Sequence, residues 1–408
     1  MIRDWSILSR HRAALLATET STGRGHVVNL TTMARALAGR FVLDAVTPDR
    51  PWQEDLLPFC RQVLMGPTLK HDMNTYLNYC HQPFNPVTLG DLLVLYGFRE
   101  KQELARQVRW WQDVMWRQKT ELLVADFAPC AMFAARSLGI PVVNTGMALT
   151  VPPTGMKRFA PILEEDGPKP QINEFETVLA INEALCSVGV PEISSLPDVF
   201  QSDVRLPCSF PFWDPYMCWR DGPYQSPLRK LPPESDGRGP EIFLYLSDHV
   251  MHAEALLEAL GSLRLPVRAV SVGRHSEEIA RLKQFDFIVE QRQVAMEDIV
   301  KKSRLILCAG QAGTCALALL SGIPLIAFPQ YKEQIANARG AEHRGGAKVF
   351  TYANSVLSLS AAELAREISH VYRNEDYHDH TRKLASQLRN TVPSDTVLSA
   401  QREMARVM

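Results

Sequence analysis

Features that mark several other classes of protein are missing from this chain of 408 residues. It has no long, uncharged apolar run of the kind that spans a membrane, so we expect no transmembrane segment. Lys and Arg number 44 and Asp and Glu 45, and a net charge of −1 provides no basic surface for the phosphate backbone of a nucleic acid. The 8 cysteines are scattered without a CxxC pair, and the N-terminus has no signal-peptide pattern. These absences predict a cytoplasmic protein with reduced thiols.

The chain is longer than one hydrophobic core usually supports, and its 46% hydrophobic and 22% charged residues are ordinary values for a globular protein. In each half, short β-rich runs alternate with stretches of helical spacing, which predicts an α/β fold with helices covering a parallel sheet. Strands are expected at 13–20, 41–47, 121–126 and 141–144, and again at 241–247, 267–272, 285–289, 304–308 and 324–328. The second half therefore repeats the architecture of the first.

A stretch dense in Pro, Gly, Ser and charge, from Pro223 to Pro240, lacks apolar periodicity and predicts a linker between domains. We expect an N-terminal domain at 1–220, a linker at 221–240, a C-terminal domain at 241–385, and a final helix at 386–408 that packs toward the N-terminal domain. A Pro-rich and Gly-rich loop at 152–170 interrupts the first half. Loops of this length are usually functional, so it is a candidate substrate loop.

One motif in the second half has the form of an anion site. Residues 305–314, LILCAGQAGT, place glycines between an apolar strand and the start of a helix. The N–H groups and the positive dipole end of a helix N-terminus attract anions, and glycine lets a pyrophosphate approach the backbone closely. On these residues alone, a tight strand-to-helix turn without a ligand explains the pattern equally well.

The residues after this motif, up to Ala338, extend it to a longer signature. They resemble the nucleotide-sugar signature of GT-B glycosyltransferases of the family-1 type, which include plant and bacterial UDP-sugar transferases. In that family the signature reads His-Gly-Gly-x-Gly-Thr, then Glu-Ala, Gly-x-Pro and Asp-Gln-x-x-Asn-Ala. Glu333 stands here in place of the Asp, and the positions that match in register are Gly310, Gly313, Thr314, Gly322, Pro324, Pro329, Gln334, Asn337 and Ala338.

The first half contains a Gly-Arg-Gly-His sequence that ends at His26 and resembles the Gly-His loop of the same family. The resemblance implies that His26 is the general base that deprotonates the acceptor hydroxyl, a task for which the near-neutral pKa of imidazole is suited. It also implies that Asp126, which ends the run Leu-Leu-Val-Ala-Asp, orients the imidazole ring. Two other roles stay open, a backbone-bonded loop histidine for His26 and a helix N-cap for Asp126.

The chain departs from the family signature at the donor site. Ala309 stands where the family has a pyrophosphate-binding His, and Leu317 where it has a ribose-binding Glu. The resemblance assigns sugar hydroxyls to Glu333 and Gln334, and the diphosphate to the helix N-terminus, so that no catalytic metal and no metal site is expected. The full expected donor-binding set is Ser247, His249, Gly310, Gln311, Ala312, Gly313, Thr314, Glu333 and Gln334.

The resemblance implies a GT-B architecture, in which two Rossmann-like domains have parallel sheets that face a cleft and C-terminal helices cross back. The implied activity is inverting transfer of a sugar from a UDP- or TDP-linked donor to a hydroxyl of a small-molecule acceptor, without a further cofactor. Apolar and aromatic residues in the first half favour a lipophilic or aromatic acceptor. Two alternatives remain. A catalytically degenerate GT-B protein, acting as a partner or binding subunit, would account for Ala309 and Leu317. A sugar-nucleotide epimerase shares the architecture, but the presence of His26 and Asp126 argues against it.

Overall fold

The computed structural model describes residues 12–20, 24–48, 53–74, 85–167, 169–246, 254–271, 276–353, 356–357 and 359–408. The chain forms two compact units, one of Met1–Gln225 with Asp395–Met408 and the other of Ser226–Ser394. The first change of unit lies within the Pro-rich stretch at 223–240. The return to the first unit follows α14 (Glu375–Leu388), so the division expected at residue 386 falls inside this helix.

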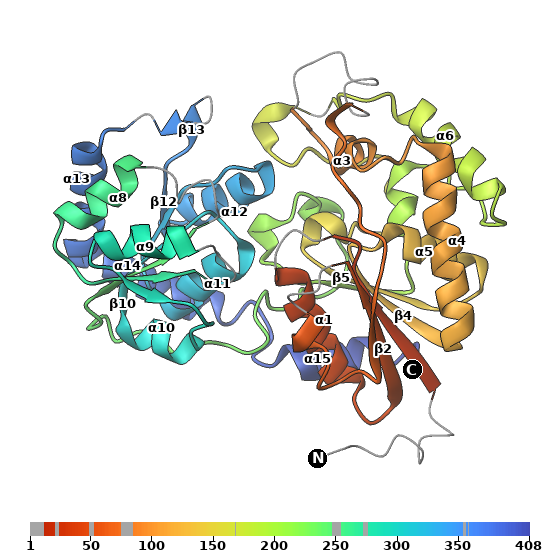
Figure 1. Cartoon of the computed structure of the whole chain (residues 1–408), viewed down its shortest axis with the longest axis horizontal. Coiled ribbons are helices and arrows are strands. Elements are labelled where there is room, and N and C mark those ends of the chain that lie inside the picture. Colours follow the sequence, from red (N-terminus) through yellow and green to blue (C-terminus); the bar gives the residue numbers. More distant parts are fainter. Residues whose placement is uncertain are drawn as a thin grey trace. The chain divides into compact units, whose positions relative to one another are not determined.

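The first unit contains a six-stranded parallel sheet in the order β3-β2-β1-β4-β5-β6 (Figure 1). Its strands are β1 (Arg12–Ala17), β2 (Phe41–Thr47), β3 (Gln62–Met65), β4 (Thr120–Asp126), β5 (Val142–Gly146) and β6 (Val204–Pro207). The inner strands are rich in Val, Leu and Ala because helices cover both of their faces. The strand order reverses between β1 and β4, as in a doubly wound Rossmann sheet.

Helices form a layer on each face of this sheet. On one face lie α1 (Gly25–Leu37) and α15 (Thr396–Met404), and on the other α4 (Lys101–Gln118) and α5 (Pro129–Ser137) (Figure 1). Two further helices are α3 (Leu89–Leu95) and α6 (Glu174–Cys186). The C-terminal helix α15 is integral to this unit, because Ala400 and Met404 are buried in the same apolar cluster as Leu30 of α1.

The second unit repeats the pattern with a parallel sheet in the order β12-β11-β10-β7-β8-β9. Its strands are β7 (Glu241–Tyr245), β8 (Val267–Val270), β9 (Ile288–Glu290), β10 (Ser303–Cys308), β11 (Leu325–Ala327) and β12 (Ala347–Val349). Its helices are α8 (Glu254–Ser262), α9 (Ser276–Gln284), α10 (Met296–Lys302), α11 (Ala312–Ser321), α12 (Lys332–Glu342), α13 (Ala361–Arg373) and α14. A two-stranded antiparallel pair, β13 (Tyr352–Ala353) and β14 (Val356–Leu357), follows β12. Here the strand order reverses between β7 and β10.

The predicted α/β architecture with two helix-covered parallel sheets is confirmed. Among the strands of the two parallel sheets, β3, β6 and β12 were not predicted from the sequence, and all three are edge strands. Each has only three or four residues and mixes polar with apolar side chains, as in Gln62–Met65. An edge strand pairs on one side only and accepts polar residues, here Gln62, Arg205 and Lys348, so it lacks the continuous apolar run that identifies a buried parallel strand.

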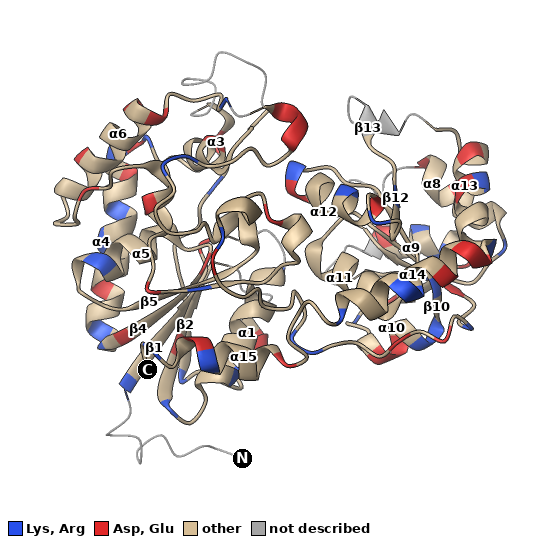
Figure 2. Cartoon of the chain, turned by 180° about the vertical axis from the view of Figure 1, so that it is seen from behind, with Lys and Arg blue, Asp and Glu red and all other residues tan. Residues whose placement is uncertain are grey.

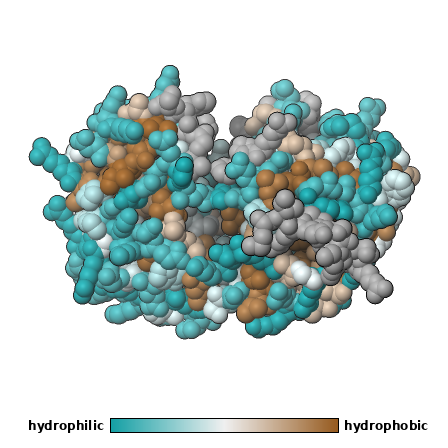
Figure 3. Space-filling model, turned by 60° about the horizontal axis from the view of Figure 1, so that its bottom comes forward, coloured by the Kyte–Doolittle hydropathy of each residue, from teal (hydrophilic) through white to brown (hydrophobic). Residues whose placement is uncertain are grey.

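Charged and apolar residues of the described part of the chain are distributed over both units. Lys and Arg are interspersed with Asp and Glu along the helices of both units (Figure 2). On the face seen in Figure 3, apolar patches are separated by hydrophilic side chains. Within the part of the chain that the structure describes, no helix is both long and apolar enough to span a lipid bilayer.

Candidate active site

The strand order of the first sheet predicts where a ligand site lies. In an open parallel sheet, the loops that leave the carboxyl ends of the two strands beside the reversal diverge and form a crevice. Here the two strands are β1 and β4, which pair in parallel as far as Ala17 and Ala125. His26 lies in the first turn of α1, which follows β1, and Asp126 is the last residue of β4. The topology therefore brings the two predicted residues to the same end of the sheet.

Their side chains are in direct contact. The distance between Nδ1 of His26 and Oδ1 of Asp126 is 2.8 Å, and the exposed fractions of the side chains are 22% and 3%. Two hydrogen bonds of 2.6 and 2.7 Å from the guanidinium group of Arg24 to Asp55 fix the start of α1 beside them. When Nδ1 of neutral His26 donates its hydrogen to this carboxylate, Nε2 has the lone pair that a general base requires.

A third residue, Asn29, completes this cluster and was missed in the sequence. Its Nδ2 atom donates to Oδ2 of Asp126 at 2.8 Å and to the hydroxyl of Thr145 at 3.1 Å. Both oxygens of the Asp126 carboxylate are thus engaged from α1, because His26 and Asn29 are three positions apart and lie on one helix face. The spacing of His26 and Asn29 in the sequence was the available signal.

The backbone of Gly146 makes room for the carboxylate. Its φ is +125°, and a Cβ atom at this position would lie 2.7 Å from Oδ1 of Asp126. Such a distance is well below van der Waals contact. A glycine at the end of β5 is therefore required for Asp126 to keep its position, and the sequence alone gave no reason to single it out.

Glu19, in the segment after β1, forms hydrogen bonds to the segment that connects β4 with α5. It is fully buried, and its carboxylate accepts hydrogen bonds from the backbone N–H groups of Cys130 at 3.1 Å and Ala131 at 2.7 Å. It thereby caps the N-terminus of α5, whose own N-cap, Ala128, has no side chain able to do so. Its backbone N–H donates to the carbonyl of Phe127, directly after Asp126. Burial raises the pKa of Glu19 to about 7, although these N–H groups lower it.

The candidate substrate loop at 152–170 is anchored at its end by a buried carboxylate. Asp91 of α3 accepts hydrogen bonds from the backbone N–H groups of Gln171 at 2.8 Å and Ile172 at 3.0 Å. Its other oxygen accepts from the backbone N–H groups of Val87 and Thr88, both at 2.8 Å. One carboxylate therefore holds two loop segments of the first unit.

In the second unit, the reversal between β7 and β10 identifies the corresponding edge of the sheet. The segment after β7 carries the predicted residues Ser247 and His249, which lie outside the described residues. The segment after β10 is the Gly-rich turn, and it leads into α11 with Gln311 as N-cap. No acidic residue occupies the first turn of α11. The first intrahelical bond of this turn is from Cys315 N–H to the Gln311 carbonyl, so the N–H groups of Ala312, Gly313 and Thr314 are those that helix geometry leaves for an anion.

The two glycines of this turn have different environments. Gly310 is buried and has a φ of +85°. A Cβ atom at this position would lie 2.6 Å from the carbonyl oxygen of Gln334. The carbonyl of Gly310 accepts a hydrogen bond from Nδ2 of Asn337 at 3.2 Å. Gly313 is exposed, and a Cβ would meet nothing within 4 Å. Gly310 is therefore required by the packing of the turn against α12, whereas Gly313 leaves the outer face of the turn open.

Two of the polar side chains predicted to bind the donor form hydrogen bonds within the protein. Gln311 Oε1 accepts from Ala309 N–H at 3.0 Å, and Gln334 Oε1 accepts from the Gln330 N–H at 3.0 Å at the start of α12. Glu333 is half-buried in the first turn of α12. Ala309 and Leu317, where the family signature has His and Glu, are both buried. Neither position offers a polar group to a donor.

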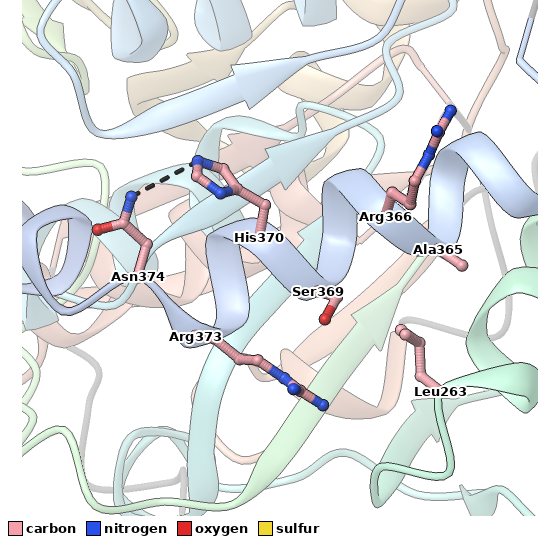
Figure 4. A pocket seen from close by; sticks show the side chains of 7 residues that line it. All are labelled: Leu263, Ala365, Arg366, Ser369, His370, Arg373 and Asn374. Carbon is pink, nitrogen blue, oxygen red and sulfur yellow. Dashed lines mark hydrogen bonds between the residues drawn. The ribbon is translucent and has the colours of Figure 1, made fainter.

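A shallow groove in the second unit, of about 660 Å³, lies apart from these residues (Figure 4). It is lined by Leu263, Ala365, Arg366, Ser369, His370, Arg373 and Asn374. The guanidinium groups of Arg366 and Arg373 extend in different directions from α13, so they do not converge on one anion. In the described part of the chain, no three His, Cys, Asp or Glu side chains are grouped as metal ligands.

Residues 273–394 match the model of the glycosyltransferase family 28 C-terminal domain, a region that includes the Gly-rich turn and α12. A search of curated proteins finds no match. Among solved structures, the chain is similar to the calicheamicin glycosyltransferase CalG4, with 16% identity, a TM-score of 0.68 and coverage of 98% of this chain and 99% of that one.

Two further structures are similar over nearly the whole chain. The glycosyltransferase VinC, solved in complex with DTDP, has 15% identity, a TM-score of 0.65 and coverage of 97% of this chain and 99% of that one. A UDP-glucosyltransferase from Polygonum tinctorium, solved with 3,4-dichloroaniline, has 14% identity, a TM-score of 0.62 and coverage of 97% and 98%. At these identities the similarity concerns the fold. The chain therefore has the two-unit GT-B fold of these glycosyltransferases, and the match to the family 28 C-terminal model lies within its second unit.

Proposed function

We propose that this protein is an inverting glycosyltransferase of the family-1 type, which moves a sugar from a UDP- or TDP-linked donor to a hydroxyl of a small acceptor. The observation that carries the proposal is the hydrogen-bonded pair of His26 and Asp126 at the strand reversal of the first sheet. A histidine paired with a buried carboxylate is a common arrangement for a general base.

In the proposed reaction, Nε2 of His26 takes the proton of the acceptor hydroxyl. The acceptor oxygen attacks the anomeric carbon of the sugar, and the bond from that carbon to the diphosphate breaks from the opposite face. The bonding electrons leave with the nucleoside diphosphate, and the anomeric configuration inverts. Asp126 stabilises the imidazolium that forms, and Asn29 keeps the carboxylate in the orientation that this requires.

On the donor side, we assign the diphosphate to the first turn of α11. The N–H groups of this turn and the helix dipole stabilise the negative charge that develops on the leaving group, which makes a catalytic metal unnecessary. Ser247 and His249 are proposed as further contacts, and Glu333 and Gln334 as contacts to sugar hydroxyls. Two of the similar structures, VinC in complex with DTDP and the UDP-glucosyltransferase, support a nucleoside diphosphate of the UDP or TDP class.

One observation favours a second candidate function. Because Ala309 and Leu317 are buried and apolar, two side-chain contacts to the donor that the family signature supplies are missing. A GT-B protein that has lost donor turnover and acts as a binding partner of another protein would tolerate both replacements.

A nucleotide screen followed by a turnover assay separates the two candidates. UDP, TDP and GDP are tested for the rise in melting temperature that ligand binding to the folded state produces. A UDP- or TDP-linked sugar is then offered with a panel of aromatic alcohols. We expect stabilisation by one nucleotide and turnover that His26→Ala reduces about 100-fold or more, the range of general-base catalysis. His370→Ala, which alters a histidine on α13, is the matched control and should keep full activity. Stabilisation by no nucleotide at millimolar concentration would reject the transferase and favour the partner subunit.

A further inference from the structure

The Gly-rich turn of the second unit is flanked by two thiols in contact. Cys308 is the last residue of β10 and Cys315 lies in the first turn of α11. Their sulfur atoms are 3.8 Å apart, and both residues are completely buried. The intervening residues 309–314 form the turn to which we assign the donor diphosphate.

Cys308 also takes part in the shape of the turn. Its sulfur accepts a hydrogen bond from the Gly310 N–H at 3.2 Å. On its other side, Gly310 is held by α12, through the hydrogen bond from Asn337 to its carbonyl and through close packing against the Gln334 carbonyl. Gly310 is thus held between the Cys308 sulfur and α12.

We propose that Cys308 and Cys315 are a reversible redox pair, which oxidation converts to an intramolecular disulfide that distorts the turn and weakens binding of the nucleoside diphosphate. The modification itself does not depend on the function proposed above. Only its effect on nucleotide binding rests on that function.

A peroxide is the oxidant class that suits so buried a pair, because it is small. One sulfur attacks a peroxide oxygen, the O–O bond breaks, and a sulfenic acid and one water form. The second sulfur then attacks the sulfenic sulfur, an S–S bond forms and a second water leaves. Overall, two thiols lose two electrons and two protons, and hydrogen peroxide is reduced to two molecules of water. A dithiol reductant reverses the step by thiol–disulfide exchange.

The geometry predicts the consequence for the turn. A disulfide requires the sulfur atoms to approach from 3.8 Å to about 2.0 Å with a dihedral angle near 90°. The end of β10 is held by its two neighbouring strands, so the start of α11 is the part that moves. A bonded Cys308 sulfur is also a poorer acceptor for the Gly310 N–H. The N–H groups assigned to the diphosphate therefore change position.

The structure also predicts that the reaction is slow. The contact with Cys308 and the burial raise the pKa of the Cys315 thiol well above its ordinary value, so little reactive thiolate is present at neutral pH. Exposed Cys186 and Cys218 should therefore be oxidised first. The modification is expected under sustained exposure to peroxide rather than as a rapid signal.

Mass spectrometry of the full-length protein tests the modification directly. Trypsin releases Leu305–Lys332 as one peptide, in which Cys308 and Cys315 are the only cysteines. Folded protein is treated with hydrogen peroxide, unfolded in N-ethylmaleimide and digested. We expect this peptide from oxidised protein to be lighter by two hydrogens and to contain no maleimide. When the oxidised protein is first treated with dithiothreitol, the peptide should take up two maleimides. If it takes up two maleimides while Cys186 and Cys218 are oxidised, the redox pair is rejected, whichever nucleotides the protein binds.

The effect on the turn is measured in the same samples. We expect hydrogen exchange of residues 309–316 to rise on oxidation, and nucleotide affinity to fall about tenfold or more, the equivalent of one lost charge-assisted hydrogen bond. Cys315→Ala should abolish both responses, whereas Cys60→Ala, which removes a buried thiol of the first unit, should keep them. A disulfide that forms without a change in hydrogen exchange would overturn its role as a switch. Failure of the reduced protein to bind any nucleotide would count against the proposed function and leave the disulfide test intact.

Discussion

Oδ1 of Asp126 lies 2.8 Å from Nδ1 of His26, although the two residues are 100 positions apart in the chain. The parallel pairing of β1 with β4 makes this contact possible, because it places the segment after β1 beside the last residue of β4. The residues around this pair can be tested one at a time.

Removal of the Asn29 amide should lower turnover without unfolding the protein. Asn29→Ala deletes the donor to Oδ2 of Asp126. A hydrogen bond to a charged group contributes about 1.5–3 kcal/mol, so we expect kcat to fall about 10- to 100-fold. Thr31→Ala is the matched control on α1, because its hydroxyl donates to the Val27 carbonyl one turn earlier and not to the cluster. Equal kcat values for wild type and Asn29→Ala would show that Asp126 does not need this partner.

A methyl group on Gly146 should displace Asp126. In Gly146→Ala the new Cβ lies 2.7 Å from Oδ1 of Asp126, and φ of +125° is strained for alanine. We expect a loss of about 1–3 kcal/mol in the free energy of unfolding together with a large loss of kcat. Gly139→Ala is the control, since its φ of +65° is also positive but its Cβ would meet no atom within 4 Å. Urea unfolding and turnover assays should show strain in both variants and lost activity only in Gly146→Ala.

The two glycines of the donor turn should respond in opposite ways. Gly313→Ala places a methyl group on the open face of the first helical turn, so we expect unchanged or slightly higher stability, by up to about 1 kcal/mol, and weaker nucleotide binding. Gly310→Ala should instead lower the melting temperature, because its Cβ would lie 2.6 Å from the Gln334 carbonyl. Thermal unfolding and nucleotide titration measure both effects. Wild-type affinity in Gly313→Ala would mean that the diphosphate does not contact this turn.

Protonation of Glu19 should make stability depend on pH. Its pKa is about 7 in the folded protein, whereas a glutamate in an unfolded chain has the ordinary value of 4.5. Between these values the folded state retains a proton that the unfolded state releases. The free energy of unfolding therefore falls as pH rises through this range, by about 3 kcal/mol from this residue. The stability that comes from neutral Glu19 is complete below about pH 4.5 and lost above about pH 7.

Glu19→Gln isolates this contribution. The variant loses an acceptor for one of the two N–H groups of α5, which lowers its stability at every pH, but it has no titrating carboxyl. We expect the difference in unfolding free energy between wild type and Glu19→Gln to shrink as pH rises from about 4.5 to about 7. The control is Glu121→Gln, which alters a half-exposed carboxylate on β4. The difference in unfolding free energy between wild type and Glu121→Gln should stay constant over the same pH range. A constant difference for Glu19→Gln as well would show that Glu19 stays ionised.

Much of the architecture was accessible from the sequence because its signals are local. A run such as Phe41–Thr47 is largely apolar since both faces of the strand are covered, and the structure assigns the strand to those same residues. His26 and Asp126 were found through the short motifs around them. Asn29 was missed because its role depends on a partner in another strand, and Asn is otherwise unremarkable in the first turns of a helix. Edge strands such as β3 were missed because half-exposed positions accept many residue types.

By itself, then, the sequence determined the alternation of strands and helices, the repeat of that pattern in two halves, and the two Gly-containing segments that follow β1 and β10. These features depend on hydrophobic periodicity and backbone conformation, which are properties of neighbouring residues. Only the tertiary structure decided that Asn29 and Gly146 meet the Asp126 carboxylate, that Glu19 caps α5, and that the thiols of Cys308 and Cys315 touch across the donor turn. Such contacts arise from strand order and helix packing, and no local pattern encodes the distance between two atoms that the chain brings together from separate elements.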